Sequence, residues 1–258
     1  MRFPCFRDDK VPFSYDQYDR PYVMKALVLS ESLAAARARL AEALRAAGRP
    51  VAGARLLAVS KTKPAGLIRE AWQLGQRDFG ENYVQEALDK QAELADLDDI
   101  VWHFIGPLQS NKTRAVAEHF AWVHSLDREK LAQRLNDQRP AGLGPLDVCL
   151  QVNISEEPSK SGVLLAELPA LAEAVLAMPA LRLRGLMAIP APAEDREAQR
   201  APFARLREAL AALQERFPDA PLDTLSMGMT ADLEAAVLEG ATLVRLGTAI
   251  FGERAARQ

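Results

Sequence analysis

The sequence predicts a (β/α)8 barrel, the TIM-barrel fold, as one domain over residues 26–258. Eight short runs rich in β-branched, leucine or aromatic residues alternate with longer amphipathic stretches. This alternation implies parallel strands joined by right-handed crossovers, and eight such units in about 200 residues match a barrel. An open doubly wound sheet is the alternative. It is disfavoured because no Gly-x-Gly-x-x-Gly follows the first strand, which ends in lysine.

A helix is expected before the first strand, at 30–47. Leu33, Leu40 and Leu44 recur at helical spacing, and Gly48 stands where a C-cap belongs. The strands are expected at 56–60, 77–80, 101–106, 122–125, 148–153, 183–189, 224–227 and 243–247. Helices are expected between them at 65–74, 84–94, 112–119, 128–136, 164–178, 194–217 and 233–239, and a short tail follows the last strand.

Residues 1–25 differ in composition from the rest of the chain. They hold three prolines and three of the four tyrosines, and they lack the apolar core and cleavage site of a secretory signal. A mobile N-terminal extension is the preferred interpretation, and an arm whose aromatic side chains cover another surface is the alternative. Translation from Met24 would also explain the difference.

Composition argues against several classes of protein. Hydrophobic residues make up 49% of the chain, and the formal net charge is −3 without a basic stripe for nucleic acid. No apolar stretch is long enough to cross a bilayer. His119 and His124 lie close together without a cysteine pair, so no zinc site is expected. The two distant cysteines, Cys5 and Cys149, are typical of a reducing cytoplasm.

Lys61 is the main candidate for chemistry. It directly follows the apolar run at 56–60. Partial loss of hydration at the tip of a buried strand favours the uncharged amine, which can form a Schiff base with an aldehyde. Most lysines are simply solvated at the surface. The interpretation therefore depends on what the other strand ends present.

The loops after the last two predicted strands indicate a phosphate site. Binding residues of such barrels lie at the carboxyl ends of the strands. Ser226 to Thr230 and Gly247-Thr248 supply hydroxyl groups and small residues, so backbone N–H groups can approach an anion. Ordinary capping is the alternative for either loop alone. The other strand ends offer Glu81, Asn82, His103, Gly106, Asn153 and Met187.

Arg245 stands in an otherwise apolar strand and needs a partner if it is buried. A ring nitrogen that accepts a hydrogen bond would serve, and a carboxylate on a neighbouring strand is the alternative. Sequence position does not decide whether Arg245 faces the barrel mouth. A Schiff-base lysine, a phosphate site and an arginine for a pyridine nitrogen together predict pyridoxal 5′-phosphate (PLP) as the cofactor.

Five segments resemble the PLP homeostasis protein family, which is similar to the N-terminal barrel of alanine racemase. They are AVSKTKP at 58–64, FGENYVQE at 79–86, WHFIGPLQSNK at 102–112, LSMGM at 225–229 and VRLGTAIFG at 244–252. The resemblance runs from about residue 30 to residue 254. It implies a PLP-binding barrel of the alanine racemase N-terminal type.

The resemblance implies roles for the residues near the covalent link. Lys61 would be the residue joined to PLP, and Lys63 would be a solvent-facing neighbour. Asn82 would lie beside the cofactor. Met187 and His103 are candidates for the pocket wall, although core packing explains each nearly as well.

The resemblance also implies the residues around the phosphate and the ring. Ser226 and the backbone of Gly247 and Thr248 would hold the phosphate, and Arg245 would lie opposite the pyridine nitrogen. Thr230 stands where a serine is common and keeps the hydroxyl group.

Two functions from different classes compete. An amino-acid racemase needs a second base opposite Lys61. In alanine racemase a tyrosine of an additional domain supplies it across a dimer, and we expect this chain to lack that domain. Its only tyrosine after residue 25 is Tyr83. We therefore expect a cytoplasmic, monomeric PLP-binding protein that stores, protects or delivers the cofactor, with apo PLP-dependent enzymes as partners and no dedicated turnover. A Schiff-base aldolase is disfavoured because it would not need Arg245 or the phosphate loops.

Overall fold

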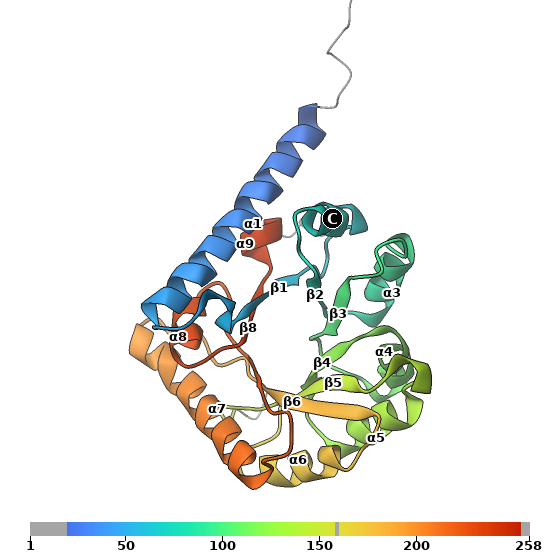
Figure 1. The fold of residues 1–258 in the computed structure, drawn as a ribbon, viewed down its shortest axis with the longest axis vertical. Coiled ribbons are helices and arrows are strands. Elements are labelled where there is room, and N and C mark those ends of the chain that lie inside the picture. The colour runs from blue at the N-terminus through green and yellow to red at the C-terminus, as the bar shows by residue number, and fades with distance from the viewer. Residues whose placement is uncertain (1–19, 158–159, 254–258) are drawn as a thin grey trace, which may run out of the picture.

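The computed structural model describes residues 20–157 and 160–253, which form a closed eight-stranded barrel surrounded by helices (Figure 1). Every strand pairs in parallel with its neighbours in sequence order, and the first strand closes on the last. The predicted (β/α)8 barrel is confirmed. Its strands are β1 (Arg55–Val59), β2 (Asp78–Glu81), β3 (Val101–Phe104), β4 (Trp122–Leu126), β5 (Leu146–Gln151), β6 (Leu181–Met187), β7 (Thr224–Ser226) and β8 (Leu243–Leu246).

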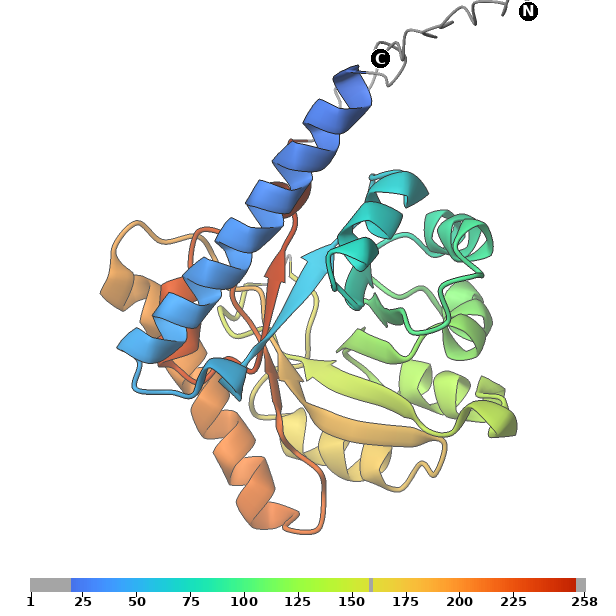
Figure 2. The same cartoon turned by 45° about the horizontal axis from the view of Figure 1, so that its top comes forward.

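The helices cover the outer face of the barrel. They are α1 (Arg20–Ala46), α2 (Ala65–Gln73), α3 (Val84–Glu93), α4 (Thr113–His119), α5 (Glu129–Gln138), α6 (Leu168–Leu176), α7 (Arg196–Arg216), α8 (Leu233–Leu238) and α9 (Thr248–Phe251), with short 3₁₀ turns at Val51–Gly53, Ser110–Lys112 and Ala141–Leu143. Figure 2 shows α1 running obliquely along the barrel and extending beyond it. This helix packs against α8, α9 and α2, so the first and last helices lie together.

The observed strands begin and end within two residues of the predicted positions. The largest difference is in α1, which begins at Arg20 rather than at residue 30. Pro21 explains the earlier start, because proline is favourable in the first turn of a helix. Residues 20–25 of the predicted extension thus belong to α1. Residues 1–19 lie outside the described residues, so the expectations of a mobile extension and of a start at Met24 are untested.

Alternate side chains of the strands belong to two different cores. Val123 and Val244 join the large apolar cluster between the sheet and the helices. Trp122, Cys149 and Met187 form a separate small cluster, which strand alternation places inside the barrel. The interior also holds four polar side chains that are at most 5% exposed: His103, His124, Ser226 and Arg245.

The described residues contain neither a candidate membrane-spanning helix nor a candidate metal site. In residues 20–157 and 160–253, no helix has the length and apolar character needed to cross a membrane. The same part of the chain contains no cluster of histidine, cysteine, aspartate or glutamate suited to a metal ion.

Candidate functional site

The predicted site residues follow neighbouring strands. β7, β8, β1 and β2 are consecutive around the barrel, so their carboxyl ends share one side of its mouth. Lys61 follows β1 and is half-buried. Gly247 follows β8, and a Cβ atom there would lie 3.2 Å from the backbone oxygen of Val59. The structure therefore brings the end of β1, which Lys61 follows, next to the last predicted loop.

A buried ion pair holds the residue before Lys61. The Ser60 hydroxyl donates to Glu81 Oε1 over 2.6 Å, and Lys90 Nζ donates to the same oxygen over 2.8 Å. Lys90 Nζ also donates to the backbone oxygen of Ser60 over 2.9 Å. Burial raises the pKa of the Glu81 carboxyl, and this effect outweighs the lowering caused by Lys90. The backbone on the N-terminal side of Lys61 is thereby anchored inside the protein.

The residue after Lys61 is also connected to Lys90, through the carboxylate of Glu86. Thr62 adopts a left-handed backbone conformation, with φ of 64°, and its N–H donates to Glu86 Oε1. Lys90 Nζ donates to that carboxylate oxygen over 2.6 Å. Sequence reasoning missed Lys90 and Glu86. The available signal was a charged residue on the buried face of α3, where Lys90 follows Val84 and Ala87 at helical spacing.

Asn82 presents a buried acceptor at the end of β2. Its Oδ1 atom is shielded from solvent and has no hydrogen-bond partner among the described residues. Such an atom is costly unless a partner is supplied. Gly106 allows the arrangement, since a Cβ atom at that position would lie 2.2 Å from the backbone oxygen of Asn82. A small ligand with a hydrogen-bond donor would satisfy this oxygen.

The loops after β7 and β8 lie side by side. The N–H of Arg245 donates to the backbone oxygen of Gly228 over 3.0 Å, and Gly228 has a φ of +93°. Thr230 and Thr248 are both exposed. The N–H of Met229 is bonded to the Asp232 carboxylate over 2.6 Å. The phosphate site therefore stays a prediction, and Gly247 and Thr248 are its better supported part.

Ser226 and Arg245 both point into the barrel interior. Arg245 Nη1 donates to the hydroxyl of Ser226 over 2.8 Å and to its backbone oxygen over 2.6 Å, and Nη2 donates to Ala188 O over 2.9 Å. Burial lowers the pKa of the Arg245 guanidinium to about 10. These partners are carbonyl and hydroxyl groups, not the carboxylate that was one alternative. They also direct the Ser226 hydroxyl toward the interior, which does not favour it as a phosphate ligand.

Lys63, Met187 and Asn153 have structural roles. The Lys63 ammonium donates to the carbonyls of Phe251, Gly252 and Glu253 over 2.6–3.0 Å, so it caps α9. These carbonyls at the helix C-terminus attract its charge. Lys63 is half-buried and two of these hydrogen bonds are exposed, so a solvent-facing Lys63 stays a prediction. Met187 is only 1% exposed and packs in the small interior cluster. Asn153 Nδ2 donates to Glu157 O over 2.8 Å within its own loop.

His103 is also part of the interior. Its Nδ1 atom lies 2.9 Å from His124 Nε2, and its ring stacks on that of Trp122 with centroids 5.5 Å apart. The alternative of core packing, rather than pocket wall, agrees with this position. Burial lowers the pKa of both histidines, most strongly for His124.

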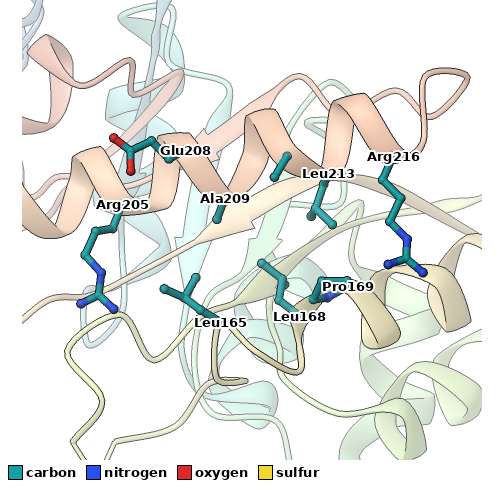
Figure 3. A pocket seen from close by; sticks show the side chains of 9 residues that line it. Leu165, Leu168, Pro169, Arg205, Glu208, Ala209, Leu213 and Arg216 are labelled. Carbon is teal, nitrogen blue, oxygen red and sulfur yellow. The ribbon is translucent and has the colours of Figure 1, made fainter.

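A separate groove lies on the outer surface, between α6 and α7 (Figure 3). It has a volume of about 340 Å³ and an apolar floor that includes Leu168 and Leu213, with Arg205 and Arg216 at its two ends. It contains none of the residues predicted for the site. We therefore place the candidate site at the barrel mouth.

Comparison with known proteins identifies relatives over most of the chain. The family model for the alanine racemase N-terminal domain matches residues 32–255. The pyridoxal phosphate homeostasis protein of Pseudomonas aeruginosa is 66% identical over 226 residues, covering 88% of this chain and 96% of that protein. The protein of the same name from Escherichia coli K12 is 54% identical over 228 residues, covering 88% and 97%.

Solved structures show the same fold. PipY of Synechococcus elongatus with PLP bound is 42% identical with a TM-score of 0.77, covering 87% of this chain and 100% of that chain. Alanine racemase from Corynebacterium glutamicum is 17% identical with a TM-score of 0.63, covering 90% of this chain and 63% of that chain. The second likeness concerns the fold alone.

Fold and site together define a class of protein. A closed parallel barrel that gathers a lysine, an unsatisfied amide oxygen and a glycine-containing loop at one side of its mouth is suited to hold a small reactive ligand. Within that class, the chain belongs to the pyridoxal phosphate homeostasis protein family.

Proposed function

We propose that this protein binds PLP at the ends of β8, β1 and β2 and acts in PLP homeostasis by storing, protecting or delivering the cofactor. The observation that carries the proposal is the anchoring of the backbone on both sides of Lys61 by Lys90 and its carboxylate partners. The family relationship supports it, since the related PipY is described with PLP bound.

The residues present fit PLP, which supplies an aldehyde, a phosphate and an aromatic ring with a hydroxyl group. Lys61 would hold the cofactor through its amine, on backbone that is already ordered. The buried Oδ1 atom of Asn82 would accept a hydrogen bond from the ligand. Arg245 would donate toward the ring nitrogen, and the backbone of Gly247 and Thr248 would approach the phosphate because no Cβ atom blocks it at Gly247.

Amino-acid racemisation is the alternative, and the site does not favour it. Two-sided proton transfer needs a second base opposite Lys61. Tyr83 precedes α3 and is 48% exposed, so it is not held in an enclosed site. We propose that the protein has no dedicated turnover, that it works in the cytoplasm, and that apo PLP-dependent enzymes receive its cofactor.

The covalent link can be tested by absorbance spectroscopy of the PLP-loaded protein before and after borohydride reduction. We expect a cofactor band that reduction converts into a stable pyridoxyl-lysine at Lys61. The Lys61→Ala variant should lose the band. The Lys63→Ala variant, a control two positions away, should keep it. Peptide mapping that finds the pyridoxyl group on Lys63 would refute the assignment.

Turnover distinguishes the carrier from the racemase. The loaded protein is incubated with single L-amino acids, and D-isomers are followed by chiral chromatography. Without a second base opposite Lys61 among the residues that the structure describes, the rate should be lower by about 10²–10⁴-fold. Racemisation at about one per second or faster, the ordinary range of enzymes, would reject the carrier.

A further inference from the structure

A continuous row of polar side chains, all buried except the half-buried Asp78, crosses the barrel interior and ends at Arg245. It begins at Asp78, the first residue of β2, whose Oδ1 atom lies 2.9 Å from His103 Nε2. His103 Nδ1 is 2.9 Å from His124 Nε2, and His124 Nδ1 is 2.7 Å from the Ser226 hydroxyl. That hydroxyl is 2.8 Å from Arg245 Nη1. The row thus joins a carboxylate at the amino end of the barrel to the arginine predicted to face the cofactor.

The charge states of the row follow from its surroundings. Burial raises the pKa of the Asp78 carboxyl, but the hydrogen bond from His103 and the charge of Arg55 outweigh it, so the pKa stays below its usual range. Burial lowers the pKa of His103 and His124, and the Arg245 charge lowers that of His124 further. Both imidazoles are therefore neutral near pH 7, and each carries a single N–H.

These states fix every proton in the row. The Asp78 carboxylate only accepts, so His103 carries its proton on Nε2 and accepts at Nδ1. His124 must then donate from Nε2, which leaves its Nδ1 as an acceptor. The hydroxyl proton of Ser226 points to that nitrogen, and the hydroxyl oxygen is free to accept from Arg245. All donors point from Arg245 toward Asp78.

The opposite direction does not satisfy the same atoms. With the proton of His103 on Nδ1, the lone pair of Nε2 would face the Asp78 carboxylate at 2.9 Å. Ser226 would then accept from both His124 and Arg245, and its own proton would have to leave the row. Buried polar groups that are unsatisfied or that repel one another raise the free energy of the folded state. The row therefore has one favourable direction.

We propose that Asp78, His103, His124 and Ser226 are positioning residues that hold the Arg245 guanidinium oriented toward the cofactor. Arg245 has carbonyl and hydroxyl partners in the interior, and the row connects it to the half-buried Asp78 carboxylate, which also pairs with Arg55. The stacked ring of Trp122 keeps His103 in register. The role toward the cofactor rests on the proposed PLP function, whereas the direction of the row does not.

The direction is tested first, on the full chain without added PLP, by ¹⁵N NMR of the imidazoles. The chain has three histidines, and the exposed His119 is an internal reference. We expect His103 and His124 to carry a proton on Nε2 and none on Nδ1. A proton on Nδ1 of either ring would overturn the proposal. This spectrum of the wild-type protein determines the direction of hydrogen-bond donation along the row, even if a variant fails to fold.

The coupling to Arg245 is tested with Asp78→Ala. Asp147→Ala is the matched control, because Asp147 lies near the start of β5 with a side chain as buried as that of Asp78, 10% against 14% exposed, and it pairs with Arg182 and Arg184 outside the row. Asp78→Ala should shift the resonances of His124 and of the Arg245 guanidinium and weaken PLP binding roughly 2- to 30-fold. The control should do neither.

Two results separate this inference from the proposed function. If Asp78→Ala shifts only the resonances of His103, the row does not couple Asp78 to Arg245, and the positioning role is refuted. If the wild-type protein fails to bind PLP at all, the proposed function fails, while the imidazole spectra still decide the direction of the row.

Discussion

One glycine determines where Asn82 can lie. Gly106 faces the Asn82 backbone so closely that a single methyl group at its Cα would overlap the carbonyl oxygen, at 2.2 Å. Neither residue stands out by type, and 24 positions separate them. Their contact arises because β2 and β3 are hydrogen-bonded neighbours. The position of Asn82, and with it that of its unsatisfied Oδ1 atom, is thus determined by the close packing of its backbone against Gly106.

We predict that Gly106→Ala displaces Asn82. Overpacking of this kind should lower the free energy of unfolding by about 1–3 kcal/mol and should also weaken PLP binding. Gly142→Ala is the control, because a Cβ atom there has no neighbour within 4 Å. Chemical denaturation and PLP titration measure the two effects. Equal behaviour of both variants would contradict the proposed place of Asn82 in the site.

Ser226 shows which aspect of the candidate site could not be predicted from sequence, namely the direction of a side chain. Its place at the end of a strand was predicted, yet the direction of its hydroxyl depends on His124, 102 positions away. Lys61 and Gly247 were easier to predict, since each follows its strand and the barrel geometry alone brings them to the mouth. The hydrogen-bond partners that sequence did not predict come from other strands or, for Lys63, from the end of α9.

At the scale of elements, α3 contributes more than a covering layer. It places Lys90 between Glu81 on β2 and Glu86 on its own surface, and that lysine also holds the backbone oxygen at the end of β1. A helix, two strands and the loop that carries Lys61 are therefore connected through one ammonium group.

Lys90→Met should destabilise the protein by about 3–5 kcal/mol, because it leaves the Glu81 carboxylate buried without a counter-charge. The effect should depend on pH. Burial already raises the pKa of Glu81, and loss of the lysine raises it further. As the pH falls, the folded state takes up a proton that the unfolded state does not yet bind, so stability is regained. The deficit against wild type should shrink from about pH 8 to about pH 5.

Chemical denaturation at several pH values measures this prediction. Arg114→Met is the control, since Arg114 pairs with Glu118 at 3.6 Å on the surface and its side chain is 68% exposed. Its removal should change stability by less than about 1 kcal/mol at any pH. A Lys90→Met deficit that is independent of pH would show that Glu81 is not the group left uncompensated.

At the scale of the whole molecule, the barrel was predictable because its pattern is repetitive. Alternation of strand-like and helix-like runs gave all eight strands in order, since each unit is recognised locally. The start of α1 was misplaced because apolar spacing was read only from residue 30, while Pro21 marks the first turn. The polar barrel interior could not be read from sequence, since its members come from five different strands.

We predict that the protein is a monomer with one PLP per chain. The proposed ligand contacts, which include Lys61, Asn82 and Arg245, all come from a single barrel. Light scattering should give a mass near 28.3 kDa with and without PLP. An obligate dimer that loses PLP binding on dissociation would contradict this expectation.

The pairing of β1 with β8 has a consequence for synthesis of the protein. Arg245 and Gly247 are translated more than 180 residues after Lys61. The two halves of the proposed site can therefore meet only after β8 has been made, and a nascent polypeptide stalled before residue 243 should retain no PLP. We expect the proposed cofactor to be loaded only after β8 has emerged from the ribosome.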